Sequence, residues 1–189
     1  HPETRVDNYP EWGRRGGWSS SSGRGWANLS NAPFRMYKRY THEGGVATPL
    51  IVHWPDGLKD QNKLRHSPGH IIDIAPTCLN AAGLSTKGME GQTLLPVFTK
   101  DSTQPRTLFW EHEGNRAVRQ GDYKLVAQHN TPWELYNMRK DRNELHDLSR
   151  SMPQKAAELK KLYEAWAHRV GTKPWDEVSV IRKKKPPKK

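Results

Sequence analysis

Residues 107–128 read TLFWEHEGNRAVRQGDYKLVAQ, and this stretch decides the fold of the second half of the chain. Residues 107–111 combine β-branched and aromatic side chains, which is typical of a strand. Two further strand patterns, at 115–119 and 123–128, are separated by a Gln-Gly-Asp turn, which predicts a hairpin. The run WELY at 133–136 predicts one more strand. The sequence therefore predicts a small antiparallel sheet.

An amphipathic helix is expected after these strands, from about residue 153 to residue 170. Apolar side chains recur there at steps of three and four, which places them on one helix face: Leu159, Leu162, Tyr163, Trp166 and Val170. Pro153 suits the first turn of a helix, and Gly171 suits the position just past its end. Strands followed by one helix predict a small α+β domain.

The first half of the chain has the pattern of an α/β sheet. The continuous apolar run LIVHW at 50–54 predicts a strand that is covered on both faces. Residues 69–72 predict a short strand that leads into a helix over residues 74–82, with Asp73 as its N-cap.

Charge and composition narrow the possible partners. The net charge is +11, but six basic residues lie among the last eight, so the other 181 residues carry only +5. A terminal run of this kind is typical of a solvated tail, so nucleic acid is not an expected partner. No stretch approaches the roughly 20 apolar residues that a membrane span needs. The single cysteine, Cys78, excludes an internal disulfide, and the sequence indicates no oligomeric state.

Several strings resemble the sulfatase family, in particular its bacterial arylsulfatase-like members. They are APFRMYKRYTHEGG at 32–45, ATPLIV at 47–52, DIAPT at 73–77, RAVRQGDYK at 116–124 and WELY at 133–136. The resemblance implies the fold class α/β, with the end of an alkaline-phosphatase-like α/β domain over residues 1–103. It further implies a small α+β domain, an antiparallel sheet with a C-terminal helix, over residues 104–175, followed by a basic flexible tail over 176–189.

The resemblance also implies an activity and its cofactors. Family members are sulfuric ester hydrolases that use a formylglycine, made from Cys or Ser in a Cys/Ser-x-Pro/Ala-x-Arg motif, beside a calcium ion held by oxygen ligands. Cys78 is followed by Leu79 and Asn80, so it does not match that motif. Asp7 and Asn8 lack the apolar strand and the glycine that surround the family's metal pair. We therefore identify no metal ligand in this chain and expect it to be inactive without an upstream part.

Four residues are candidates for the site. Lys38 matches the lysine that family members place against the sulfate, where an ammonium stabilises developing negative charge, so we predict that Lys38 is catalytic. The resemblance further predicts that His42, His112 and Arg116 contact the substrate from neighbouring loops. The pair Gly44-Gly45 is expected to permit a close backbone approach between the Lys38 segment and the strand expected at 50–54.

The substrate implied by the family is a sulfated small molecule or carbohydrate, and the implied location is the periplasm or the exterior of the cell. Two other functions stay open at this stage. A carbohydrate- or polyanion-binding module would use the Trp-rich start of the chain and its basic tail. A phosphodiesterase or phosphonate hydrolase of the same superfamily would use a similar pocket, because phosphate and sulfate centres have similar shapes.

Overall fold

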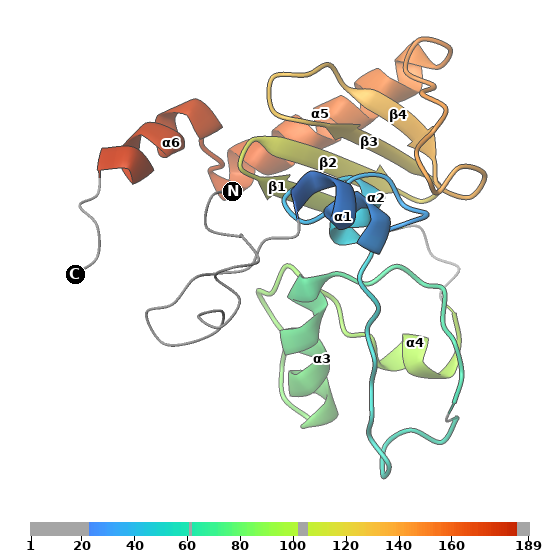
Figure 1. Ribbon diagram of the computed structural model, residues 1–189. Coiled ribbons are helices and arrows are strands. Elements are labelled where there is room, and N and C mark those ends of the chain that lie inside the picture. Colours follow the sequence, from blue (N-terminus) through green and yellow to red (C-terminus); the bar gives the residue numbers. More distant parts are fainter. Residues whose placement is uncertain (1–22, 61, 102–105, 185–189) are drawn as a thin grey trace, which may run out of the picture. The chain divides into compact units, whose positions relative to one another are not determined.

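The computed structural model in Figure 1 describes residues 23–60, 62–101 and 106–184 of the protein. Contacts divide the chain into two compact units. One contains the described residues of His1–Thr48 and Phe109–Lys189, and the other is Pro49–Leu108. The segment with the predicted catalytic lysine therefore belongs with the second half of the chain.

A four-stranded antiparallel sheet forms the centre of the first unit, in the order β1 (Thr107–His112), β2 (Asn115–Gln120), β3 (Tyr123–Ala127) and β4 (Glu134–Asn137). Val118 of β2 pairs with Leu125 of β3, which in turn pairs with Leu135 of β4. The hairpin turns at Gly121, whose φ of 57° is readily adopted by glycine. The predicted sheet and its hairpin are confirmed.

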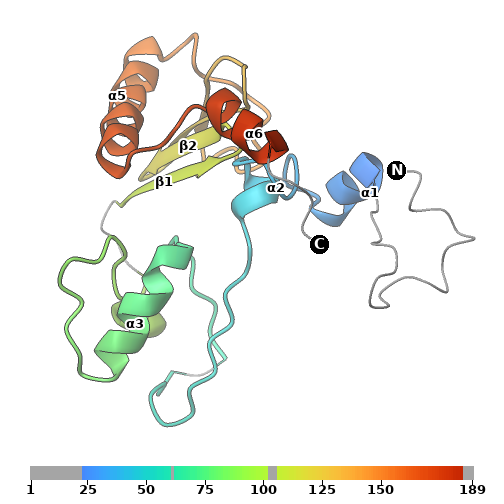
Figure 2. The same ribbon diagram turned by 90° about the vertical axis from the view of Figure 1, so that its left-hand side faces the viewer.

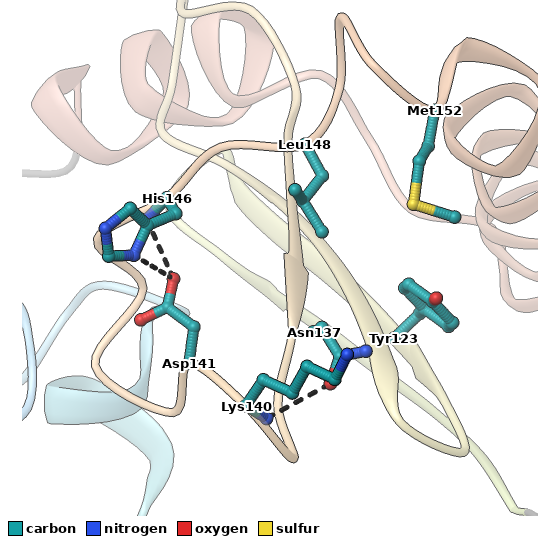
Figure 3. Close-up of a pocket in the computed structure, with 7 residues that line it drawn as sticks. All are labelled: Tyr123, Asn137, Lys140, Asp141, His146, Leu148 and Met152. Carbon is teal, nitrogen blue, oxygen red and sulfur yellow. Dashed lines mark hydrogen bonds and ion pairs between the residues drawn. The ribbon is translucent and has the colours of Figure 1, made fainter.

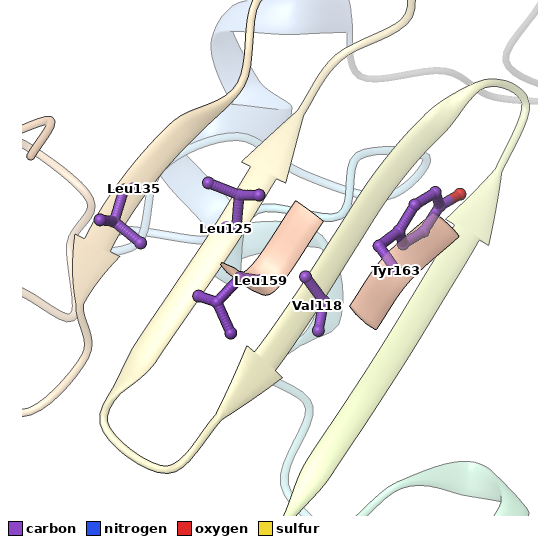
Figure 4. Packing of buried hydrophobic residues seen from close by; sticks show 5 residues of the cluster. All are labelled: Val118, Leu125, Leu135, Leu159 and Tyr163. Carbon is purple, nitrogen blue, oxygen red and sulfur yellow. The ribbon is translucent and has the colours of Figure 1, made fainter. Parts of the chain in front are cut away.

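The helix α5 (Pro153–Val170) covers one face of this sheet. Its buried side chains pack against the residues that point to that face, as Figure 4 shows, and this cluster comprises Val118, Leu125, Leu135, Leu159 and Tyr163. The helix begins at Pro153, and Gly171 caps its end in the left-handed conformation with φ of 71°. The predicted helix is therefore confirmed with its boundaries, and it is followed by α6 (Trp175–Lys184).

The opposite face of the sheet carries a second, smaller cluster of buried side chains: Ala117, Val126, Tyr136 and Met138. Residues of α2 (Glu43–Val46) and of the loop before it lie on this side, while α5 lies on the other side (Figure 2). The short helix α1 (Gly23–Ser30) precedes that loop. Both faces of the sheet are thus covered within the unit.

The unit Pro49–Leu108 contains η3 (Ile71–Asp73), α3 (Ile74–Ala81) and α4 (Leu95–Thr99). Asp73 is fully buried, receives backbone N–H bonds from His70 and Gln92, and forms an ion pair with Arg106. Burial alone would raise the pKa of Asp73, but the bonds from Arg106 and these backbone groups lower it. Asp73 stands at the expected N-cap position of α3, but its side chain makes no cap bond to that helix, and the carboxylate instead holds the η3 turn through the His70 N–H.

Two expected strands of this unit are wrong. Residues 50–54 have no regular secondary structure and their apolar side chains are exposed, Ile51 by 89%. Residues 69–72 lead into the 3₁₀ turn η3 rather than forming a strand. A strand needs a neighbouring strand for its backbone hydrogen bonds, and no such neighbour pairs with either segment among the described residues. An apolar run alone therefore did not establish a strand.

Candidate functional site

Lys38 lies in a loop that returns to its own starting point. We call residues Arg35–Gly44 the Lys38 loop. The N–H of Gly44 donates to the carbonyl of Arg35 at 2.8 Å and closes the base of the loop, and the N–H of Tyr40 donates to the carbonyl of Tyr37 at 3.1 Å near its tip. Lys38 is exposed in that turn. The loop therefore presents an ammonium group at the end of a closed frame.

The glycine pair makes this closure possible. A Cβ on Gly44 would lie 2.1 Å from the carbonyl oxygen of Met36, and a Cβ on Gly45 would lie 1.9 Å from that of Tyr40. Neither position has room for a side chain. The expected close backbone approach is confirmed, but the approaching segment is the Lys38 loop itself and not residues 50–54.

Arg35 attaches one end of the Lys38 loop to strand β4. Its Nη1 donates to Glu134 Oε2 at 2.9 Å and to the Tyr136 hydroxyl at 2.7 Å, and the Tyr136 hydroxyl donates to Glu134 Oε2 at 2.7 Å. The imidazole of His42 completes the group, with Nε2 lying 3.2 Å from Glu134 Oε2. Burial alone would raise the pKa of Glu134, but the hydrogen bonds from His42, Arg35 and Tyr136 hold it at about 2. This carboxylate therefore stays charged at neutral pH.

Glu43 attaches the other end of the loop to strand β3. Lys124 Nζ lies 3.0 Å from Glu43 Oε1 and 2.8 Å from Glu144 Oε1, and all three side chains are buried. Glu43 Oε2 also accepts from Nε of Arg142 at 3.2 Å. Burial would raise the pKa of Glu43, but Lys124 and Arg142 lower it. The backbone N–H of Glu43 donates to Glu144 Oε2 at 2.9 Å, so side chain and backbone are both held.

The structure brings one predicted substrate contact close to the Lys38 loop. Arg39 Nε forms an ion pair with Glu113 at 2.8 Å, and the carbonyl of Arg39 accepts from Asn115 Nδ2 at 3.2 Å. Both partners lie in or beside the turn that joins β1 to β2, and exposed His112 is the last residue of β1. Lys38 and His112 are therefore carried by segments that touch.

The other two predicted contacts have partners inside the protein. His42 is fully buried and faces Glu134. The guanidinium of Arg116 lies 4.6 Å from the centre of the Trp133 ring, and Trp133 packs against the cluster under α5. Arg116 thus lies on the sheet face that α5 covers, away from the Lys38 loop.

An open pocket of about 350 Å³ lies between β3, β4 and the loop that follows β4. Figure 3 shows its lining, which comprises Tyr123, Asn137, Lys140, Asp141, His146, Leu148 and Met152. The carboxylate of Asp141 accepts backbone N–H bonds from Leu145 and His146, and Asn137 Oδ1 accepts from the Lys140 N–H. These polar groups stabilise the turns of the chain, and none of the predicted site residues lines the pocket.

Comparison with known proteins identifies the family. Residues 34–168, well over half of the chain, match the family model described as N-sulphoglucosamine sulphohydrolase, C-terminal. The chain belongs to the sulfatase family. The predicted resemblance is thereby confirmed, and the matched range includes the Lys38 loop, the sheet and most of α5.

The relatives of this sulfatase chain are longer proteins. An uncharacterized sulfatase of Schizosaccharomyces pombe is 30% identical over 158 residues, which is 75% of this chain but 28% of that protein. N-acetylgalactosamine-6-sulfatase of Mus musculus is 37% identical over 100 residues, 50% of this chain and 19% of that protein. The chain thus spans less than a third of the length of these relatives.

A solved structure confirms the fold. The crystal structure of Ps i-CgsB superposes with a TM-score of 0.62 at 26% identity, over 72% of this chain and 32% of that one. The same protein has been solved in complex with k-i-k-neocarrahexaose.

The described residues of this sulfatase chain do not form a calcium site. Over residues 23–60, 62–101 and 106–184, no group of three or more His, Cys, Asp or Glu side chains could hold a metal ion. Asp7 and Asn8 lie outside the described residues. Within the described part of the chain, no helix is long and apolar enough to cross a membrane.

Sequence reasoning missed the polar side chains that hold the Lys38 loop, which are the half-buried Arg35 and Glu134 and the buried Glu43, Lys124, Tyr136 and Glu144. One local signal was available. In the run YKLVA, Lys124 alternates with Leu125 and so shares a sheet face with Val126, which is buried. A lysine on an apolar strand face that is covered by other residues requires a carboxylate partner.

Proposed function

We propose that this chain is the C-terminal portion of an enzyme that hydrolyses sulfate esters of a carbohydrate, and that Lys38 is one of its catalytic residues. The observation that carries the proposal is the Lys38 loop. It places an exposed ammonium at the tip of a closed, doubly attached frame, within the range matched by the sulfatase family model. A fixed ammonium stabilises the negative charge that develops as the sulfate ester breaks.

The names of two relatives support the proposed substrate class. Ps i-CgsB binds a neocarrahexaose, and the mouse relative is named for a sulfated amino sugar. Both names point to sulfated carbohydrate. His112 would contact the sugar from the end of β1, beside the turn that touches the Lys38 loop. His42 and Arg116 remain predicted contacts that would have to leave their present partners, Glu134 and Trp133.

Formylglycine and calcium belong to the proposed complete enzyme. A calcium ion bound in that enzyme would polarise the sulfate. The residues described here do not fit either group, since they form no cluster of ligands and Cys78 lacks the modification motif. We therefore expect turnover only from the complete enzyme. In that enzyme, residues 1–103 would form the end of the α/β domain, residues 104–175 the small domain and residues 176–189 a basic tail. We also propose that this enzyme is periplasmic or secreted.

The test is substitution of Lys38 in the complete enzyme. Lys38→Ala should lower kcat for sulfate release from a sulfated oligosaccharide by about 10²- to 10³-fold, as loss of one charge-stabilising donor does in other enzymes. Lys161→Ala, which removes an exposed lysine on α5, is the matched control and should leave kcat unchanged. Near-normal kcat in Lys38→Ala would overturn the role of Lys38.

The same enzyme can be tested against the alternatives. A polyanion-binding module would bind sulfated polysaccharide with an affinity that falls steeply with salt, without releasing sulfate. A phosphodiesterase would turn over a phosphate diester faster than the corresponding sulfate ester. Sulfate release that depends on Lys38 contradicts the binding module, and faster turnover of the sulfate ester than of the phosphate diester contradicts the phosphodiesterase.

A further inference from the structure

We propose that Lys124 is a positioning residue for Lys38. The buried ammonium of Lys124 holds the base of the Lys38 loop against the sheet, so that the ammonium of Lys38 meets the sulfate in one place. This inference rests on the proposed function of Lys38. It assigns a role to the buried charge cluster of Lys124, Glu43 and Glu144.

Lys124 links the Lys38 loop to the sheet. Its side chain is fully buried in the middle of the sheet, on the face opposite to α5, and lies between two carboxylates. Glu43 is the last residue but one of the Lys38 loop, and Glu144 follows β4. Lys124 therefore connects the loop to the sheet and to the segment after β4.

A charged side chain is costly at this buried position. A buried ion pair loses the hydration of both charges, and apolar side chains of similar volume often stabilise a fold as well or better. The neighbours Ala117 and Val126 on the same face show that apolar residues pack there. Stability alone therefore does not explain a lysine at position 124. Positioning does explain the lysine, because its ammonium pairs with Glu43 and so fixes the position of that side chain.

The bonds of Glu43 also restrict the position of the loop tip. Glu43 is held through both carboxylate oxygens and through its backbone N–H, and the next residue closes the loop by its bond to Arg35. Lys38 lies five residues before Glu43 in this closed frame. A displacement of about 1 Å at a reacting group can cost 10²-fold in rate. Release of Glu43 would permit such a displacement.

The experiment is a double-mutant cycle in the complete enzyme, with kcat and KM measured for sulfate release from a sulfated oligosaccharide. Lys124→Met should lower kcat by about ten- to a hundred-fold. In the Lys38→Ala background, Lys124→Met should lower kcat less than about threefold, because residues that act as one unit give non-additive losses. Lys161→Met is the matched control in both backgrounds and should change neither value.

A second variant covers the case in which Lys124→Met fails to fold, since that change removes the cation of the buried Glu144 and leaves the buried Glu43 with Arg142 alone. The triple change Lys124→Met, Glu43→Gln and Glu144→Gln removes the three charges together and keeps the side-chain shapes. Circular dichroism verifies its fold, and the same kcat loss and the same lack of effect in the Lys38→Ala background are expected.

The outcomes separate the two proposals. If Lys124→Met lowers kcat equally with and without Lys38, or leaves it unchanged in the wild-type background, Lys124 does not position Lys38. If Lys38→Ala itself keeps near-normal kcat, the proposed function of Lys38 fails, whatever Lys124→Met does.

Discussion

Replacement of Gly44 by alanine is expected to open the base of the Lys38 loop. The new Cβ would lie 2.1 Å from the carbonyl oxygen of Met36, about 1.3 Å closer than an ordinary contact of 3.4 Å, and 2.5 Å from that of Arg35. Both neighbours are backbone atoms, so two peptide units have to move. Overpacking of this kind costs roughly 1–3 kcal/mol. Loss of the bond from Gly44 N–H to the Arg35 carbonyl adds about 1 kcal/mol.

These two costs together predict that the closed loop loses roughly 2–4 kcal/mol of stability relative to its open forms. Since each 1.4 kcal/mol is a factor of ten, the amide groups of the loop should exchange with deuterium about 30- to 700-fold faster. Hydrogen exchange measured by mass spectrometry on peptides that cover residues 35–46 would detect this change. The complete protein is suitable for the measurement because the signal is local.

Gly25→Ala is the matched control. A Cβ on Gly25 meets nothing within 4 Å, and the residue lies inside helix α1, where alanine is the better helix former. Exchange in the Lys38 loop should be the same in this variant and in the wild type. If Gly44→Ala also leaves exchange in residues 35–46 unchanged, the loop is not closed by the contacts described here, and the argument for a fixed Lys38 fails with it.

The sheet and α5 could be predicted from sequence because their signals are local. Runs rich in β-branched and aromatic residues, a Gly-containing hairpin turn, and an apolar stripe bounded by Pro153 and Gly171 each indicate an element within about 20 residues. The strand expected at 50–54 failed for the opposite reason. An apolar run indicates only that a segment favours burial. A strand also needs backbone hydrogen bonds to a neighbouring strand, and none of the described residues supplies them to 50–54.

The candidate site was predicted only in part. The Lys38 motif was recognisable because its residues are contiguous in sequence. The charges that hold the loop are not contiguous, since Lys124 is 81 residues from Glu43 and Arg35 is 99 residues from Glu134. Ion pairs between residues so far apart in the chain produce no periodic pattern from which they could be predicted. This also explains why the sequence did not predict the contact between His42 and Glu134, which are 92 residues apart.

The remaining predictions concern the core and the pH dependence of stability. Leu159→Ala creates a cavity at a fully buried position between α5 and the sheet. It should lower the free energy of unfolding, measured in urea, by about 2–5 kcal/mol. Lys161→Ala, on the exposed side of α5, should change that free energy little. Glu134 has a pKa of about 2 in the fold, against 4.5 when unperturbed, so the unfolded chain binds the proton first as the pH falls. Its bonds to Arg35 and His42 therefore stabilise the fold fully above pH 4.5, by up to about 3 kcal/mol, and this contribution is lost between pH 4.5 and 2. Glu134→Gln should lower stability at pH 7 and flatten the stability profile over that window, and a variant with the same pH slope as the wild type would show that Glu134 is not held charged by these partners.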